Sequence, residues 1–536
     1  MFFFSDHHIL ATILFTPLAG AFVLLFVPGV CTDLRRKIAN CFGLLGLVVS
    51  LPLWWKFKSS SAEPFQFVCD ASWIPSIDVH FRLGIDGISL LMVMLTTLLG
   101  AIAILSSWAA VRHREKEYYI LLLLTQAGLL GVFMSLDFVL FYVFWEAMLV
   151  PIYFSIAAWG GENRVRAALK FILYTVAGSV VMLLAILAVY HARGTFDVRE
   201  ILLHPFSAES GHLQSWLFWG FFFAFAIKVP MFPFHAWLAD AISEAPTGVA
   251  IMLAGVLLKT GTYGFLRFSV AMFPNAALQY RSLLITLSVV AILYGALICL
   301  AQKDMNRLIA YSSVSQMGFC MLGIFLLSPL GFYGSVILQV SHGLTTGALL
   351  AIAGMFYERR HTNVISDFGD LTSSMPKLAV TYLIITCAAL GMPLLSGFVG
   401  EFSILRGAFD MHWPIAACAL LGVLLTVAYL IWLYGRVMLG SATNAGDGNL
   451  PDLDRRELAT LVTVIILTVW IGIYPASLFR VLRQPIEQIL NSIEQLVSVV
   501  RPGHCFEAVQ SASPQTLPNA NLCSVAAPGN AADEAK

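Results

Sequence analysis

Charged residues are scarce in this sequence of 536 residues. Only 12% of its residues are charged and 59% are hydrophobic, whereas about 25% charged residues is typical of soluble globular proteins. This composition excludes a soluble protein. Lysine plus arginine and aspartate plus glutamate number 31 each, so the formal net charge is zero and nothing favours nucleic acid as a partner. The sequence therefore predicts the lipid bilayer as its surroundings.

Clustered cysteines and nucleotide-binding motifs are also missing. The nine cysteines are too widely spaced for an iron–sulfur cluster, a zinc site or a disulfide framework. The sequence has neither a glycine-rich dinucleotide fingerprint nor a phosphate-binding loop motif. We therefore expect this chain itself to bind no metal, nucleotide, flavin or iron–sulfur cofactor. Energy for any transport must then come from an ion gradient or from partner subunits.

Long apolar stretches between charges and turn residues dominate the sequence instead. They predict an all-α polytopic membrane protein, because long runs such as residues 284–300 do not fit the short alternating strands of a membrane barrel. No lysine or arginine precedes Arg35, so the first stretch is expected to be a retained span rather than a cleavable signal peptide. The about fourteen predicted spans are residues 8–29, 38–55, 85–110, 118–135, 138–158, 167–190, 214–238, 248–272, 282–301, 307–327, 330–356, 378–409, 414–438 and 458–475.

The loops between these spans indicate the topology. Odd-numbered loops hold more lysine and arginine than even-numbered loops, which predicts that both termini lie on the non-cytoplasmic side. Alternating residues at 65–68 and 77–83 predict a small external hairpin. The expected domains are residues 1–110 with spans one to three and the hairpin, 111–272 with spans four to eight, 273–440 with spans nine to thirteen, 441–500 with span fourteen and an amphipathic segment, and 501–536 as a disordered tail.

Four charged side chains stand out within the predicted spans, where a charge costs at least about 2.5 kcal/mol on insertion scales. They are Glu146 in span five, Lys228 in span seven, Lys259 in span eight and Glu401 in span twelve. Such groups can pair and simply hold helices in register. Lysine and glutamate, unlike arginine, can also gain and lose protons when buried, so the set equally predicts a proton relay. His342 in span eleven is either a further relay member or a packed histidine.

Proline and glycine interrupt two spans beside these charges. Pro230 and Pro233 follow Lys228, and Gly391 lies ahead of Glu401 in the unusually long span twelve. Prolines often only kink membrane helices. Broken helices at corresponding places in two halves, however, are typical of inverted-repeat transport folds. We therefore predict that spans seven and twelve are broken, and that spans four to eight and nine to thirteen form two inverted five-helix repeats.

Several longer motifs carry a family resemblance. They are residues 144–153, 228–238, 244–247, 253–261, 306–313 and 397–402. These motifs resemble the antiporter-like subunits of respiratory complex I, the NADH:quinone oxidoreductase, and they span most of residues 80–440. The antiporter-like subunits of complex I are of several types. The chain has glutamate at position 401, where the other types resemble one another in having lysine, so the resemblance is strongest to the one type with glutamate there. Position 316 departs from the pattern, because Gln316 stands where many relatives have a titratable histidine.

The resemblance implies a proton-pumping membrane-arm subunit, itself without redox chemistry, of a proton-translocating NADH:quinone oxidoreductase in the bacterial cytoplasmic membrane. Glu146 and Lys228 would form an ion pair whose separation changes the proton affinity of the lysine. Lys259 would be the central relay residue, His342 a connecting residue, and Glu401 the terminal group that exchanges protons with the far side.

The same resemblance implies the partners. They would be other membrane-arm subunits, especially neighbouring antiporter-like subunits, with NADH, FMN, iron–sulfur clusters and quinone bound elsewhere in the complex. Two alternatives remain open at this point. The chain could be a subunit of a multi-subunit cation/proton antiporter of the Mrp type, or a scaffold that has kept the fold without transporting ions.

Overall fold

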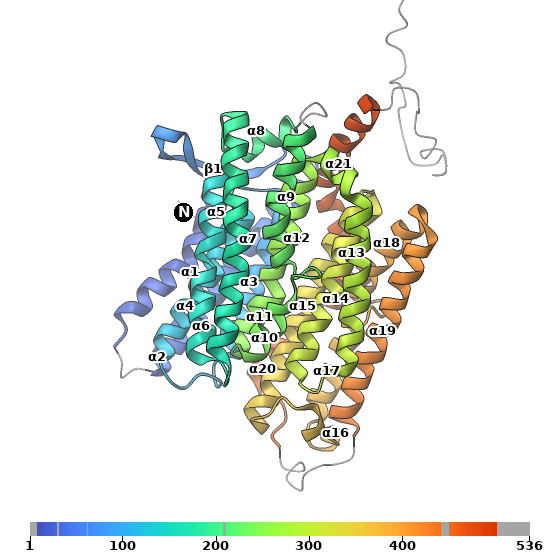
Figure 1. Ribbon diagram of the computed structural model, residues 1–536. Coiled ribbons are helices and arrows are strands. Elements are labelled where there is room, and N and C mark those ends of the chain that lie inside the picture. Colours follow the sequence, from blue (N-terminus) through green and yellow to red (C-terminus); the bar gives the residue numbers. More distant parts are fainter. Residues whose placement is uncertain (1–7, 29–31, 62, 207–210, 441–449, 501–536) are drawn as a thin grey trace, which may run out of the picture.

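The computed structural model describes residues 8–28, 32–61, 63–206, 211–440 and 450–500, and these form a bundle of long helices with one two-stranded hairpin (Figure 1). The predicted disordered tail lies outside the described residues. The first half contains α1 (Ile9–Phe26), α2 (Thr32–Lys56), β1 (Gln66–Ile74), β2 (Val79–Ile85), α3 (Gly87–Ser106), α4 (Glu115–Met134), α5 (Phe138–Ala147), α6 (Leu149–Trp159), α7 (Arg164–Arg193), α8 (Val198–Leu203), α9 (Gly211–Lys228) and α10 (Ala236–Glu244).

The second half begins with one long span built from α- and π-helical pieces. The elements are α11 (Thr247–Met252), the π-helical segment η4 (Leu253–Leu257), α12 (Leu258–Gly264), the π-helical segment η5 (Phe265–Val270), α13 (Pro274–Ala301), α14 (Met305–Phe325), α15 (Pro329–Arg360), α16 (Leu371–Ser374), α17 (Pro376–Ala389), α18 (Ser396–Met411), α19 (Trp413–Met438), α20 (Arg455–Ile473) and α21 (Ala476–Val500).

The predicted membrane spans correspond to this architecture. Among the described residues, twelve helices are long and apolar enough to cross a membrane, with α5 and α6 forming one of them and α11 to η5 another. The remaining two predicted spans are the interrupted ones. In span seven α9 ends at Lys228 and α10 begins at Ala236, and in span twelve α17 ends at Ala389 and α18 begins at Ser396. The all-α polytopic fold and both helix breaks are therefore confirmed, while the inverted relation of the two repeats stays a prediction.

Each break has a local cause. Pro230 and Pro233 lack the N–H groups that would continue α9, and the N–H of Met231 donates to the carbonyl of Ala226 at 2.9 Å in place of the missing N–H of Pro230. The carbonyl of Ile227 is thereby freed and accepts a hydrogen bond of 2.9 Å from the indole of Trp237. A buried carbonyl at membrane depth needs such a partner. In span twelve Gly391 has a φ of 76°, a left-handed conformation that glycine adopts without steric cost. The breaks therefore follow from proline in one repeat and mainly from glycine in the other.

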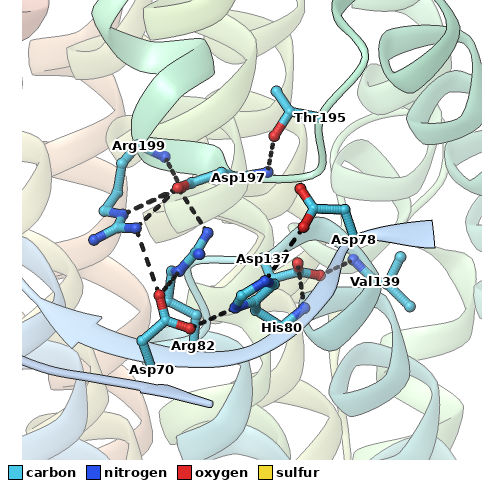
Figure 2. Close-up of polar contacts among 9 residues, drawn as sticks. All are labelled: Asp70, Asp78, His80, Arg82, Asp137, Val139, Thr195, Asp197 and Arg199. Carbon is cyan, nitrogen blue, oxygen red and sulfur yellow. Dashed lines mark hydrogen bonds and ion pairs between the residues drawn. The ribbon is translucent and has the colours of Figure 1, made fainter. Parts of the chain in front are cut away.

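The predicted hairpin is present and is fixed to the bundle by charged residues (Figure 2). Asp70 on β1 lies 2.7 Å from His80 Nδ1 and 2.6 Å from Arg82 Nε on β2, and Arg82 also pairs at 2.6 Å with Asp197 before α8. Partial burial raises the pKa of Asp70, but the hydrogen bonds from His80 and Arg82 outweigh burial and lower this pKa overall. The hydrogen bond with Asp70 in turn raises the pKa of His80. Both strands and the start of α8 thus form one charged network.

Contacts of this network also show on which side of the bundle the even-numbered loops lie. The backbone N–H of His80 donates to Asp137 Oδ2 at 3.2 Å, and Asp137 also caps the start of α5. The loops after spans two, four and six therefore meet at one end of the bundle, where Figure 1 shows β1, α8 and α21 together. This arrangement agrees with the predicted even-numbered side.

The predicted amphipathic segment is the helix α21, which lies at the same end. Leu478, Leu482 and Ile486 on one face of α21 are buried, and the helix packs against α3 and α15. The contact with α3 is so close that a Cβ atom at Gly87 would lie 2.0 Å from the carbonyl oxygen of Val481. The apolar face of α21 therefore covers protein.

Candidate functional site

The centre of the site is a contact between Lys259 on α12 and His342 on α15. The Lys259 side chain is fully buried, and its Nζ lies 2.7 Å from His342 Nδ1. The same Nζ donates to the carbonyl of Ala254 at 2.6 Å. Ala254 belongs to the π-helical segment η4, and π-helical turns are frequent at functional sites. The local widening of this helix thus supplies an acceptor for the buried lysine.

This contact is suited to proton transfer. An ammonium group can only donate, so protonated Lys259 requires Nδ1 of His342 to be the acceptor and places the imidazole proton on Nε2. When the lysine is uncharged, its nitrogen can accept a proton from the ring through the same contact. A proton can therefore move between the two helices without a rearrangement of the backbone.

A small cavity connects His342 with Glu401. Its volume is about 10 Å³, which is roughly the space that one water molecule needs. Both side chains line it, and Nε2 of His342 has no hydrogen-bond partner among the described residues. Gln316 also lines the cavity and donates from Nε2 to Glu401 Oε1 at 3.0 Å. One water molecule between the imidazole and the carboxylate would complete a hydrogen-bonded route from Lys259 to Glu401.

Glu401 is buried against the break in span twelve. Only 3% of its surface is exposed, and a Cβ atom at Gly391 would lie 2.2 Å from Glu401 Oε2. Any side chain larger than that of glycine at this position would push the Glu401 carboxylate aside and would also have to adopt the left-handed φ of 76°. At the break, the carboxylate therefore packs directly against the backbone of Gly391.

Lys228 lies at the end of α9, at the other break. It is 1% exposed, its Nζ is 4.7 Å from the centre of the Trp145 ring, and Nζ has no hydrogen-bond partner among the described residues. An aromatic ring attracts a cation through its negatively charged face. The ring of Trp145 on α5 therefore stabilises the buried ammonium group of Lys228 through a cation–π contact.

Glu146 and Lys228 form no salt bridge in this structure, so the ion pair that the resemblance implies stays a prediction. Both residues are described, and no ion pair within 4.0 Å joins them. The reason lies in the geometry of α5: successive helix residues point about 100° apart, so the buried Trp145 faces Lys228 while Glu146 lies on a half-buried face.

The structure adds polar groups that the sequence motifs did not single out. Thr262 donates to Gln339 Oε1 at 2.7 Å, Gln339 Nε2 donates to Ser335 at 3.2 Å, and Ser335 donates to the carbonyl of Cys320 at 2.8 Å. This chain joins spans eight, eleven and ten next to Lys259. Its only sequence signal is the occurrence of small polar residues within apolar spans.

Comparison with known proteins gives a family match and close relatives. Residues 135–426 match the family "NADH:quinone oxidoreductase/Mrp antiporter, TM". The chain is 43% identical to NADH-ubiquinone oxidoreductase chain 4 of Arabidopsis thaliana, over 87% of this chain and 94% of that one. It is 42% identical to NADH-quinone oxidoreductase subunit M of Rhodobacter capsulatus, over 88% of this chain and 94% of that one.

Solved structures show the same fold. A chain of respiratory complex I from Thermus thermophilus with bound NADH superposes with a TM-score of 0.82 at 31% identity, covering 90% of this chain and 99% of that chain. A chain of the Mrp complex from Dietzia sp. DQ12-45-1b superposes with a TM-score of 0.78 at 22% identity, covering 92% of this chain and 56% of that chain.

Proposed function

Since the chain belongs to the NADH:quinone oxidoreductase/Mrp antiporter family, we propose that it is a proton-pumping membrane-arm subunit of an NADH:quinone oxidoreductase. The observation that carries the proposal is the route from Lys259 through His342 and one cavity to Glu401. The relatives named chain 4 and subunit M match over nearly their whole length, and this is the subunit type that Glu401 indicated.

The proposed proton route uses hydrogen bonds along the bundle. Lys259 passes a proton to His342 Nδ1, the ring releases its Nε2 proton to a bridging water molecule, and Glu401 accepts it and exchanges it with the far side. Gln316 does not titrate and instead orients the Glu401 carboxylate. When Glu146 and Lys228 move apart, the proton affinity of Lys228 falls and its proton passes on to Lys259. When they approach each other, that affinity is restored. NADH oxidation and quinone reduction belong to partner subunits that hold the cofactors.

The placement in the membrane is part of the same proposal. We place the chain in the bacterial cytoplasmic membrane with both termini on the non-cytoplasmic side. Glu146 is half-buried within a span, and its Oε1 is buried without a hydrogen-bond partner among the described residues; an unpaired carboxylate at membrane depth is costly. A neighbouring antiporter-like subunit packed against α5 would cover it.

The antiporter alternative has weaker support. The Mrp likeness is below 25% identity and concerns the fold, whereas the relatives with 42–43% identity carry quinone oxidoreductase names. Sodium-dependent proton exchange by the chain without any electron donor would favour the antiporter.

Lys228→Ala and Glu146→Ala test the function of the chain as a pump. We expect each change to lower both proton pumping and NADH-driven quinone reduction in the assembled complex, by about tenfold for the lysine, since roughly 1.4 kcal/mol on the limiting barrier has that effect. Assembly is checked on native gels. Lys37→Ala and Glu117→Ala, which change exposed loop or helix-end residues, serve as controls. An unchanged proton-to-electron ratio together with unchanged turnover in both variants would exclude a relay through these groups.

Gln316→His and Gln316→Leu separate an orienting role from a structural one. Histidine can still donate an N–H to Glu401, so we expect nearly normal pumping. Leucine keeps the approximate volume but leaves a buried carboxylate oxygen without its donor, and we expect pumping to fall by about tenfold because a hydrogen bond to a charged group is worth about 1.5–3 kcal/mol. Equal activity of the two variants would contradict the orienting role.

A further inference from the structure

A second, much larger cavity lies outside the relay, at the hairpin end of the bundle. Its volume is about 550 Å³, within the range of about 300–1,000 Å³ that is usual for small-molecule sites. Four parts of the chain enclose it: the start of the hairpin, α8, the end of span eight and α21. The network in Figure 2 fixes one wall, because Arg199 pairs with Asp197 at 2.9 Å and both line the cavity.

The cavity offers charge of both signs. Arg267 is 5% exposed; its Nη2 pairs with Asp86 at 2.5 Å, while its Nε is buried and has no hydrogen-bond partner among the described residues. Glu63 and Glu200 line the same cavity with exposed side chains, and no ion pair within the described part of the chain involves either of them. A complementary ligand would thus carry an anionic group for Arg267 and an ammonium group for the two glutamates.

The remaining lining indicates an amphipathic ligand. Phe65, Val68, Leu202 and Ile489 form apolar wall, and it continues to Leu203, which is 67% exposed. Arg267 and Ala271, which also line the cavity, lie at the end of span eight. The cavity therefore lies at the level where the spans end and where lipid headgroups meet water.

From the buried unpaired Arg267 Nε, the two unpaired glutamates and the apolar wall that reaches the surface, we propose that this cavity binds a phospholipid with a primary-amine headgroup, of the phosphatidylethanolamine type. The phosphate lies at Arg267, the ammonium group at Glu63 and Glu200, and the acyl chains leave along Leu202 and Leu203. A primary ammonium donates three hydrogen bonds. A trimethylated choline headgroup has no N–H to donate, so the site discriminates between lipids of equal charge and equal chains.

The test measures lipid retention rather than pumping, so its outcome is independent of the proposed function. The whole assembled complex is placed in bilayers of phosphatidylcholine with a minor fraction of phosphatidylethanolamine, and the lipids bound per complex are counted by native mass spectrometry. We expect phosphatidylethanolamine to be enriched over its bulk fraction in the unaltered complex. In Glu63→Gln/Glu200→Gln, retention should weaken by about tenfold, since charge-assisted hydrogen bonds are lost.

Glu117→Gln/Glu162→Gln is the matched control, because both side chains are exposed and neither lines the cavity. Asn491→Trp on α21 provides a second variant that fills the cavity and leaves both glutamates in place; it should also reduce retention. Equal enrichment of phosphatidylcholine, or unchanged retention in Glu63→Gln/Glu200→Gln and Asn491→Trp, would overturn the proposal. Displacement of the lipid by soluble glycerophosphoethanolamine at equal affinity would overturn the assignment to a lipid.

Discussion

Replacing Lys259 with methionine will stop proton movement through this subunit and lower NADH-driven quinone reduction by about tenfold or more, as expected when a buried transfer group is removed from a coupled cycle. Methionine has a similar length and flexibility but cannot carry a proton. The change leaves Nδ1 of His342 and the carbonyl of Ala254 without the donor that they share. No other described side chain hydrogen-bonds to His342 Nδ1, so no neighbouring group replaces the lysine.

Lys303→Met is the matched control, because Lys303 is an exposed lysine in the loop after α13. It removes the same positive charge from the chain and should leave both rates unchanged. Rates are measured in reconstituted vesicles by a pH-sensitive dye and by quinone reduction, after assembly has been confirmed. If Lys259→Met and Lys303→Met behave alike, Lys259 is only a packing residue.

Replacing Gly391 with alanine will disable the Glu401 carboxylate, the terminal group of the relay, although Glu401 itself is unchanged. The new Cβ would lie 2.2 Å from Glu401 Oε2, and the φ of 76° at this position is one that alanine rarely adopts. The carboxylate must move, and its 3.0 Å hydrogen bond from Gln316 is lost or lengthened. We expect proton pumping to fall at least about tenfold, because misplacement of a reacting group by about 1 Å can cost far more than that.

Gly435→Ala provides a control for this change. Gly435 lies in α19, and a Cβ atom there would meet no other atom within 4 Å. The alanine variant should assemble and pump normally, since alanine also favours a helix more than glycine does. Normal pumping by assembled Gly391→Ala would show that the close packing of Glu401 against Gly391 has no part in proton exchange.

The sequence predicted the fold closely because its signals are local. Apolar length defines a span, and proline or glycine beside a charge marks a break, so the gaps after Lys228 and before Ser396 were expected. The hairpin was placed correctly but too short: β1 continues to Ile74, past the predicted end at residue 68. Pairing with β2 extends the strand there, and such cross-strand contacts leave little trace in the alternation of one strand.

The site was predicted as a set of residues but not as a geometry. Lys259 and His342 are 83 positions apart, and no spacing rule relates two residues on different helices. Gln316 stood out only as a missing histidine, while the structure makes it the donor to Glu401. The contact of Lys228 with the ring of Trp145 was not expected, because the side that a residue faces depends on the exact end of α5.

The number of protons translocated per electron in the reconstituted complex tests the central claim most directly. It should be measured for the unaltered complex, Lys259→Met and Lys303→Met under identical conditions. A relay through Lys259, His342 and Glu401 predicts a lower ratio, or none measurable because turnover stops, in Lys259→Met alone. An unchanged ratio at undiminished turnover in assembled Lys259→Met would contradict the account.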